Sequence, residues 1–273
     1  MKKVVLLMFA LLLGAGNWCI AQPFFQLEPK SMYKEDLKLT PADWAGFYKT
    51  YRKELMIIVP ASDSSITGIY TYNYSNGLLV GTLKGTLKGN GVEFEWNEAL
   101  IGSNEAPESG NGFMIMKENR KDVYLKHGTE HTTGNYTAGK KKEIEIDGKL
   151  NNEPWLGKWS VSIYEQSTMT AERYDDALIG YYTLQGYKST DVFNGWNKTT
   201  ITTHTMPDRT VLMLGFGIGN MLYYLSNNYV EDDIKTGVIT MSDDQKSFTG
   251  QEVRSDQLGV KWKNGFTGKR ISK

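Results

Sequence analysis

The chain has 273 residues, with 31 Lys and Arg against 31 Asp and Glu, and a single cysteine, Cys19. The balanced charge leaves no basic excess to bind phosphates, which argues against nucleic acid as a partner. One cysteine excludes intramolecular disulfides and thiolate metal clusters. Many aromatic residues, 28 glycines and only 7 prolines are typical of twisted, turn-rich β structure.

The N-terminus has the pattern of an export signal. Lys2 and Lys3 precede an unbroken apolar run at 4–13, and cleavage is expected after Ala21. The run is shorter than the roughly 20 residues that span a membrane, and no later segment is apolar enough. Bulky Trp18 disfavours a lipid anchor at Cys19. We therefore expect 1–21 to be a signal peptide and the protein to be periplasmic or secreted.

The next elements predict a first β domain at 41–139, after an N-terminal lead-in at 22–40. Thr40-Pro41-Ala42-Asp43 predicts one helical turn, because Thr caps a helix and Pro fits its first position. The apolar run 55–59 predicts a buried strand. Residues 66–74 alternate as a strand does and place Tyr70, Tyr72 and Tyr74 on one face. The turn at 75–77 then predicts a hairpin.

The rest of the first domain is predicted to continue as short strands. Val92, Phe94 and Trp96 share one strand face, and Glu93 and Glu95 share the other. A polar loop is expected at 97–110, followed by strands at 113–116 and 123–127. Such short strands, separated by frequent turns, indicate a barrel or sandwich with up-and-down connections.

The lysine run at 140–142 and the Asp147-Gly148 turn predict a linker at 140–153, before a second domain at 154–273. Alternating and apolar segments predict the strands of this domain at 159–164, 168–174, 178–184, 198–204, 209–216, 221–225, 236–241, 246–253 and 258–263. The tail at 262–270 is expected to form a closing strand.

A repeated pattern relates the two halves. Trp44-Ala45-Gly46-Phe47-Tyr48 is followed by Gly68-Ile69-Tyr70, and Trp155-Leu156-Gly157-Lys158-Trp159 is followed by Gly180-Tyr181-Tyr182. The first elements lie 155 − 44 = 111 residues apart and the second 180 − 68 = 112 residues apart. A repeat of this length indicates one small domain used twice. The predicted fold class is therefore all-β, with two tandem antiparallel up-and-down barrel-like or sandwich domains.

Gly157-Lys158-Trp159 resembles the Gly-x-Trp opening of lipocalins, and with Gly180-Tyr181-Tyr182 it resembles avidin-type barrels, which are also calycins. The first copy, Gly46-Phe47-Tyr48, has Tyr in place of Trp. The resemblance implies barrels that hold one small apolar ligand, with Tyr70 and Tyr182 as hydrogen-bonding residues. Residues 146–155 are also similar to the opening of some bacterial carbohydrate-binding β-sandwich modules, although a turn before a buried Trp explains them more simply.

The candidate ligand-binding residues are aromatic side chains of these strands: Tyr70, Tyr72, Tyr74, Trp96, Trp159 and Tyr182. Cross-strand packing and core formation are the simpler explanations of the same residues. The leading hypothesis is an exported, non-enzymatic binding protein for a small apolar or carbohydrate ligand, which needs no cofactor. A surface or assembly protein without a ligand is a further alternative.

Two catalytic alternatives follow from charged residues. Glu93, Glu95 or Asp175 would serve as acid or base in an extracellular carbohydrate-active enzyme, although a solvated outer face explains them more simply. His127 and His131 fit a zinc-protease string, but glycine and threonine neighbours disfavour the required helix. On a strand the two histidines would lie about 13 Å apart, too far for one ion. We therefore expect no metal site.

Overall fold

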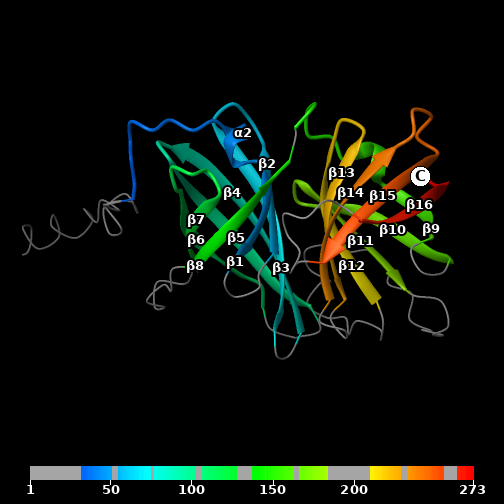
Figure 1. Ribbon diagram of the computed structural model, residues 1–273. Helices are drawn as coiled ribbons and strands as arrows, with labels where there is room; N and C mark the ends of the chain where they lie inside the picture. The colour runs from blue at the N-terminus through cyan, green and yellow to red at the C-terminus, as the bar shows by residue number, and fades with distance from the viewer. Residues whose placement is uncertain are drawn as a thin grey trace, which may run out of the picture.

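The computed structural model describes residues 32–50, 55–74, 77–101, 106–127, 137–144, 146–162, 166–183, 210–228, 233–254 and 263–273. It contains two closed antiparallel barrels that follow one another along the chain (Figure 1). This confirms the predicted all-β class with two barrel-like domains. Within these ranges, no helix has the length and apolar character required to cross a membrane. The predicted signal peptide at 1–21 lies outside them.

The first barrel follows a one-turn helix, α2 (Pro41–Trp44), which confirms the predicted helical turn. Thr40 and Asp43 form a capping box at its start. The strands are β1 (Gly46–Thr50), β2 (Leu55–Pro60), β3 (Ser65–Tyr74), β4 (Gly77–Lys88), β5 (Gly91–Ile101), β6 (Glu108–Met116), β7 (Asp122–His127) and β8 (Thr137–Glu143). Each pairs with its neighbour in sequence, and β8 pairs with β1 to close the barrel.

The second barrel has the same plan. A 3-10 turn, η2 (Glu153–Trp155), precedes its first strand. The strands are β9 (Gly157–Ser162), β10 (Gln166–Tyr174), β11 (Ala177–Thr183), β12 (Thr210–Ile218), β13 (Met221–Asn228), β14 (Asp233–Met241), β15 (Ser247–Arg254) and β16 (Lys263–Ser272). Closure comes from the pairing of β16 with β9, which confirms the predicted closing strand.

Two predicted segments, the linker and the polar loop of the first domain, differ from the structure. The expected linker 140–153 begins too early, because 140–143 belong to β8 and pair with β1. The expected polar loop 97–110 is mostly strand, since β5 runs to Ile101 and β6 begins at Glu108. The pairing of β5 with β6, which extends to Glu98 opposite Glu108, outweighs the polar composition of this segment. The strand predicted at 198–204 lies outside the described residues.

Large side chains in both barrel interiors lie over glycines of the next strand. Phe94 in β5 stands opposite Gly112 in β6, and a Cβ at Gly112 would lie 2.5 Å from the ring atom Cζ. In the second barrel Phe248 covers Gly268 in the same way. A narrow barrel cannot hold bulky residues at every inward position. Glycines and aromatic residues therefore occur together in these barrels, because a ring on one strand packs over a glycine on the neighbouring strand.

A third apolar cluster joins the outer walls of the two barrels. Its residues include Phe47, Leu55, Ile57, Ile69, Val80, Leu212, Leu214, Phe216, Tyr223 and Leu225, all with at most 7% of their surface exposed. Phe47 meets Tyr223 edge-on with ring centroids 6.4 Å apart. The buried amide Nδ2 of Asn227 in β13 donates to Thr71 Oγ1 in β3 at 3.1 Å. The two barrels therefore share a core and do not sit on a free linker.

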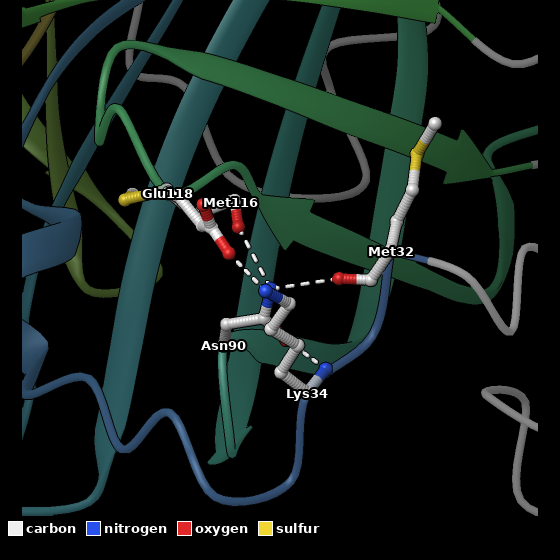
Figure 2. A network of polar contacts seen from close by, with 5 residues as sticks. All are labelled: Met32, Lys34, Asn90, Met116 and Glu118. Carbon is white, nitrogen blue, oxygen red and sulfur yellow. Dashed lines mark hydrogen bonds and ion pairs between the residues drawn. The ribbon is translucent and has the colours of Figure 1, made fainter.

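The described part of the lead-in is fixed to the first barrel by Asn90, in the β4–β5 turn (Figure 2). Asn90 Oδ1 accepts from the backbone N–H of Lys34 at 2.7 Å, and Nδ2 donates to the carbonyls of Met32 and Met116 at 2.9 Å each. Lys34 also forms an ion pair with Glu118. Residues 32–39, which we call the strap, thus lie along the barrel wall where Met32 and Tyr33 cover Phe113 and Ile115.

Candidate functional site

The repeated Trp-x-Gly-x-aromatic pattern forms a plug at one end of each barrel. In the first barrel the Tyr48 hydroxyl donates to the carbonyl of Trp44 at 2.6 Å. In the second, the Trp159 indole N–H donates to the carbonyl of Trp155 at 3.0 Å. All four rings are buried. The fifth residue of each pattern therefore satisfies a carbonyl that the short helical turn leaves without an intrahelical partner, and burial raises the pKa of Tyr48.

Arg270 on the last strand holds the second plug in place. Its guanidinium lies over the Trp159 ring, 4.1 Å from the centroid. Nη1 donates to the carbonyl of Leu156 at 2.9 Å, Nε to that of Gln245 at 2.9 Å, and Nη2 to that of Pro154. Phe248 packs on the ring as well, 5.2 Å between centroids. Trp159, which we expected to bind ligand, is enclosed by these residues and is 0% exposed.

A polar pair lies deeper inside the first barrel. The Tyr70 hydroxyl on β3 donates to Glu98 Oε1 on β5 at 2.6 Å, and both residues are buried. Gly81 on β4 stands between them in register, opposite both Tyr70 and Glu98. A Cβ at Gly81 would lie 2.1 Å from Tyr70 Cζ, so only glycine lets the ring cross the middle strand. Tyr70 was predicted from sequence, whereas Glu98 and Gly81 were not.

The second barrel repeats this arrangement on other strands. The Tyr224 hydroxyl on β13 donates to Glu252 Oε2 on β15 at 3.1 Å. Gly237 on β14 lies between them in register, and a Cβ there would lie 2.3 Å from Tyr224 Cζ. Lys235 adds a charge, because its Nζ lies 2.9 Å from Glu252 Oε1. Both barrels thus hold a glutamate whose carboxylate is fixed by a tyrosine crossing a glycine.

Residual exposure differs among the buried residues of the two barrels. Around the plugs, Trp44, Tyr48 and Trp159 are 0% exposed. Further along the first barrel, Tyr70 retains 7%, and Leu79, Glu98 and Leu100 retain 8% each. Val211, Met213 and Phe266 of the second barrel retain 5–6%. Tyr70 and Glu98 of the first barrel therefore keep a small residual exposure, whereas Tyr224 and Glu252 of the second barrel are 1% and 2% exposed.

The structure brings together part of the predicted site. Tyr72 packs, half-buried, against the cluster that contains Tyr70 and Trp96. Trp96 lies in this interior over Gly110, and its Nε1 donates to the carbonyl of Asn111 at 3.3 Å. Tyr74 and Tyr182 belong to β3 and β11, but their side chains lie outside the described residues, as does His131.

The residues missed by sequence reasoning carried a usable signal. The face that holds Val92, Phe94 and Trp96 reaches Glu98 after two more residues, so alternation places this glutamate on the same face as those apolar side chains. Glu252 follows Phe248 by four residues on the same face of β15. A carboxylate on an otherwise apolar strand face marks a buried polar site.

Two of the carboxylates proposed for catalysis, Glu93 and Glu95, line a groove, and the third, Asp175, contacts Lys84 of that groove. A hollow of about 790 Å³ over β3–β6 is lined by Lys84, Lys88, Glu93, Glu95 and Asp176, among others. Lys88 pairs with Glu93, and Lys84 Nζ lies 2.8 Å from Asp175 and 2.9 Å from Asp176. Burial lowers the pKa of Lys84, but hydrogen bonds to the two aspartates outweigh it, so the pKa is raised. Lysines thus pair with Glu93, Asp175 and Asp176, while Glu95 is exposed.

Comparison with known proteins gives no functional assignment. The chain matches no family model and no curated protein sequence. Among solved structures it is similar to Aeromonas veronii immune modulator A, with 8% sequence identity and a TM-score of 0.29, covering 88% of this chain and 98% of that one. A similarity at this level carries no argument, so the functional reading depends on the site alone.

Proposed function

We propose that the protein is an exported, calycin-like binding protein that holds a small, mainly apolar ligand inside the first barrel and catalyses no reaction. The observation that carries this proposal is the buried hydrogen bond from Tyr70 to Glu98 in an apolar interior, between two residues that retain 7% and 8% exposure. The export pattern at 1–21 and the Gly-x-Trp resemblance support the remaining parts.

The free-energy cost of burying Glu98 favours a functional role for the Tyr70–Glu98 pair. Moving a carboxylate from water into a protein interior costs several kcal/mol, and apolar residues of similar volume are commonly as stable or more stable. A glutamate retained in an apolar barrel therefore points to recognition. Tyr70 holds one carboxylate oxygen in place, and Leu79, Leu100 and Tyr72 supply apolar surface beside it. The ligand class that fits is an apolar molecule with a hydrogen-bond-donating head group.

The groove carboxylates support an enzyme less well. Acid–base hydrolysis of glycosides needs two carboxyl groups facing each other across the scissile bond. Glu93 and Glu95 instead stand side by side on one strand, and Glu93 is held by Lys88. An ion-paired outer surface accounts for this arrangement.

The test is a titration of the full chain with N-phenyl-1-naphthylamine, a neutral fluorescent probe, followed by displacement with 1-decanol. Glu98→Leu and Tyr70→Phe are expected to weaken decanol binding to the first barrel about tenfold or more, through loss of the polar anchor. The matched control is Tyr124→Phe, which removes a tyrosine hydroxyl that is not part of the Tyr70–Glu98 pair. Tyr124 lies on β7, and the Nζ of Lys117 is 4.8 Å from the centroid of its ring. Undiminished decanol binding by folded Glu98→Leu would rule the proposal out.

A further inference from the structure

We propose that the second barrel contains its own ligand site, built on Lys235, Glu252 and Tyr224, for a small apolar molecule with an uncharged hydroxyl group. This inference goes beyond the function proposed for the first barrel, because other residues carry it and it names a different selectivity. We call the three residues the triad.

An ion pair inside an apolar barrel is the first observation. Glu252 is 2% exposed, and the Lys235 side chain is 11% exposed. Around them the interior is made of residues such as Met213, Val211 and Phe266. Desolvating both charges costs more than an exposed pair would return, and well-packed apolar residues usually give equal or greater stability. Stabilisation of the fold therefore does not by itself account for these charged residues in the barrel.

The triad is also held in a fixed position. Each oxygen of the Glu252 carboxylate has its own donor, Lys235 Nζ at 2.9 Å and the Tyr224 hydroxyl at 3.1 Å. The Tyr224 ring is seated over Gly237 and meets Phe266 edge-on, at 6.3 Å between centroids. A preorganised set of donors and acceptors recognises a head group without the cost of reorganisation.

Duplication of the domain does not explain the triad. Tyr70 and Glu98 use the third to fifth strands of the first barrel, whereas Tyr224 and Glu252 use the fifth to seventh strands of the second. The residue that the repeat aligns with Tyr70 is Tyr182, on β11. The arrangement thus stands at a different place in each barrel.

Charge decides the class of ligand. Lys235 and Glu252 carry opposite charges 2.9 Å apart, so an ion bound beside them would add a further charge to a low-dielectric interior. An uncharged hydroxyl both donates to the carboxylate and accepts from the ammonium. Ser226 is buried and stands directly opposite both Met213 and Lys235 in register. We therefore place the proposed head-group site beside Ser226 on β13, between β12 and β14.

The experiment counts 1-decanol molecules on the full chain by native mass spectrometry and measures affinities by displacement of N-phenyl-1-naphthylamine. The unmodified chain is expected to bind two decanol molecules, and decanoate and decylammonium about tenfold more weakly at the triad. The double variant Lys235→Met with Glu252→Leu, which keeps the charge balance, is expected to bind one. Lys246→Met, in the exposed β14–β15 turn, is the control and should bind two.

A single change gives a readout that a structural role would not produce. Lys235→Met leaves the Glu252 carboxylate without this ammonium, so the second site should change its preference from decanol to decylammonium. Should the double variant fail to fold by circular dichroism, Ser226→Trp supplies a second test, because the large ring fills the middle of the site and should remove one bound decanol.

The outcomes separate this inference from the first-barrel proposal. One decanol lost on changing Glu98 and the other lost on changing Lys235 and Glu252 supports both. Binding that depends on Glu98 but is indifferent to the triad and to Ser226→Trp overturns the inference alone. Binding that depends only on the triad overturns the first-barrel proposal alone, and a chain that binds no decanol overturns both.

Discussion

At the scale of single residues, the barrels are built from pairs of a large ring and a glycine on the next strand. In the pairs of Tyr70 with Gly81 and of Tyr224 with Gly237, the ring crosses a whole strand to reach a glutamate. The position of the hydroxyl is therefore set by the absence of a side chain opposite the ring.

Gly81→Ala tests this relation. The new methyl group would lie 2.1 Å from Tyr70 Cζ, so the ring must leave its position and the hydrogen bond to Glu98 breaks. We expect the free energy of unfolding to fall by about 2–4 kcal/mol, measured in urea. Gly265→Ala is the control: its Cβ meets only a carbonyl oxygen at 3.9 Å, and its stability should be unchanged or slightly raised. Equal effects at the two sites would contradict the packing model.

The β14–β15 turn provides a pH-dependent contribution. The backbone N–H of Lys246 and the Ser242 hydroxyl donate to Asp244 Oδ1 at 3.0 and 2.8 Å and lower the pKa of this carboxyl. Since the folded pKa lies below the unfolded one, the stabilisation is present above the unfolded pKa of about 3.9 and is lost as pH falls through the folded pKa. The stability difference between the unmodified chain and Asp244→Asn should thus shrink on acidification, as followed by urea unfolding at each pH. A difference that stays constant with pH would exclude this role.

At the scale of elements, each barrel is closed by contacts that bring distant segments together. Arg270, on β16, binds carbonyls of the η2 turn and of the β14–β15 turn while covering Trp159. Lysine has neither the planar fork nor the stacking surface for this set of contacts.

Arg270→Lys is therefore expected to destabilise the chain by about 2–3 kcal/mol, because carbonyl hydrogen bonds and the cation–π contact are lost together. Thermal unfolding and tryptophan fluorescence measure it, since Trp159 should become more solvated. Lys269→Met, at the exposed neighbouring position, should have no measurable effect. Full stability of Arg270→Lys would show that charge alone suffices.

The strap depends on Asn90 in the same way. Asn90→Ala removes one acceptor and two donor hydrogen bonds that reach Lys34, Met32 and Met116. We expect faster hydrogen exchange and proteolysis over 32–39, with β3–β6 still protected. Asn119→Ala is the matched control, because Asn119 Oδ1 accepts hydrogen bonds from the backbone N–H groups of Lys121 and Asp122 within its own turn. Unchanged exchange over the strap would refute this role for Asn90.

At the scale of the whole molecule, the apolar cluster between the barrels predicts one cooperative unfolding transition. Leu225, 0% exposed in that cluster, is the site to test. Leu225→Lys buries an unpaired charge and should separate the two barrels, giving two transitions by calorimetry in place of one. Thr249→Lys, on the exposed outer face of β15, should retain a single transition. Two transitions in the unmodified chain would contradict a shared core.

The sequence by itself determined the all-β class, the duplicated domain and the shared strand face of Val92, Phe94 and Trp96. These follow from alternation with a period of two, from turn residues and from a motif that recurs in register, all of which are local properties of the chain. The same alternation also contained Glu98, but it does not say which face of a strand is enclosed.

Only the tertiary structure decided which residues meet. Leu55–Val59 is apolar on both faces because one face fills the first barrel and the other packs on the second, which no pattern within the strand distinguishes from a strand inside one domain. The pairing of Tyr224 with Glu252, 28 residues apart, needs the register of β13, β14 and β15 together. Register is set by the closure of the whole barrel, and closure is a property that no single segment of the sequence contains.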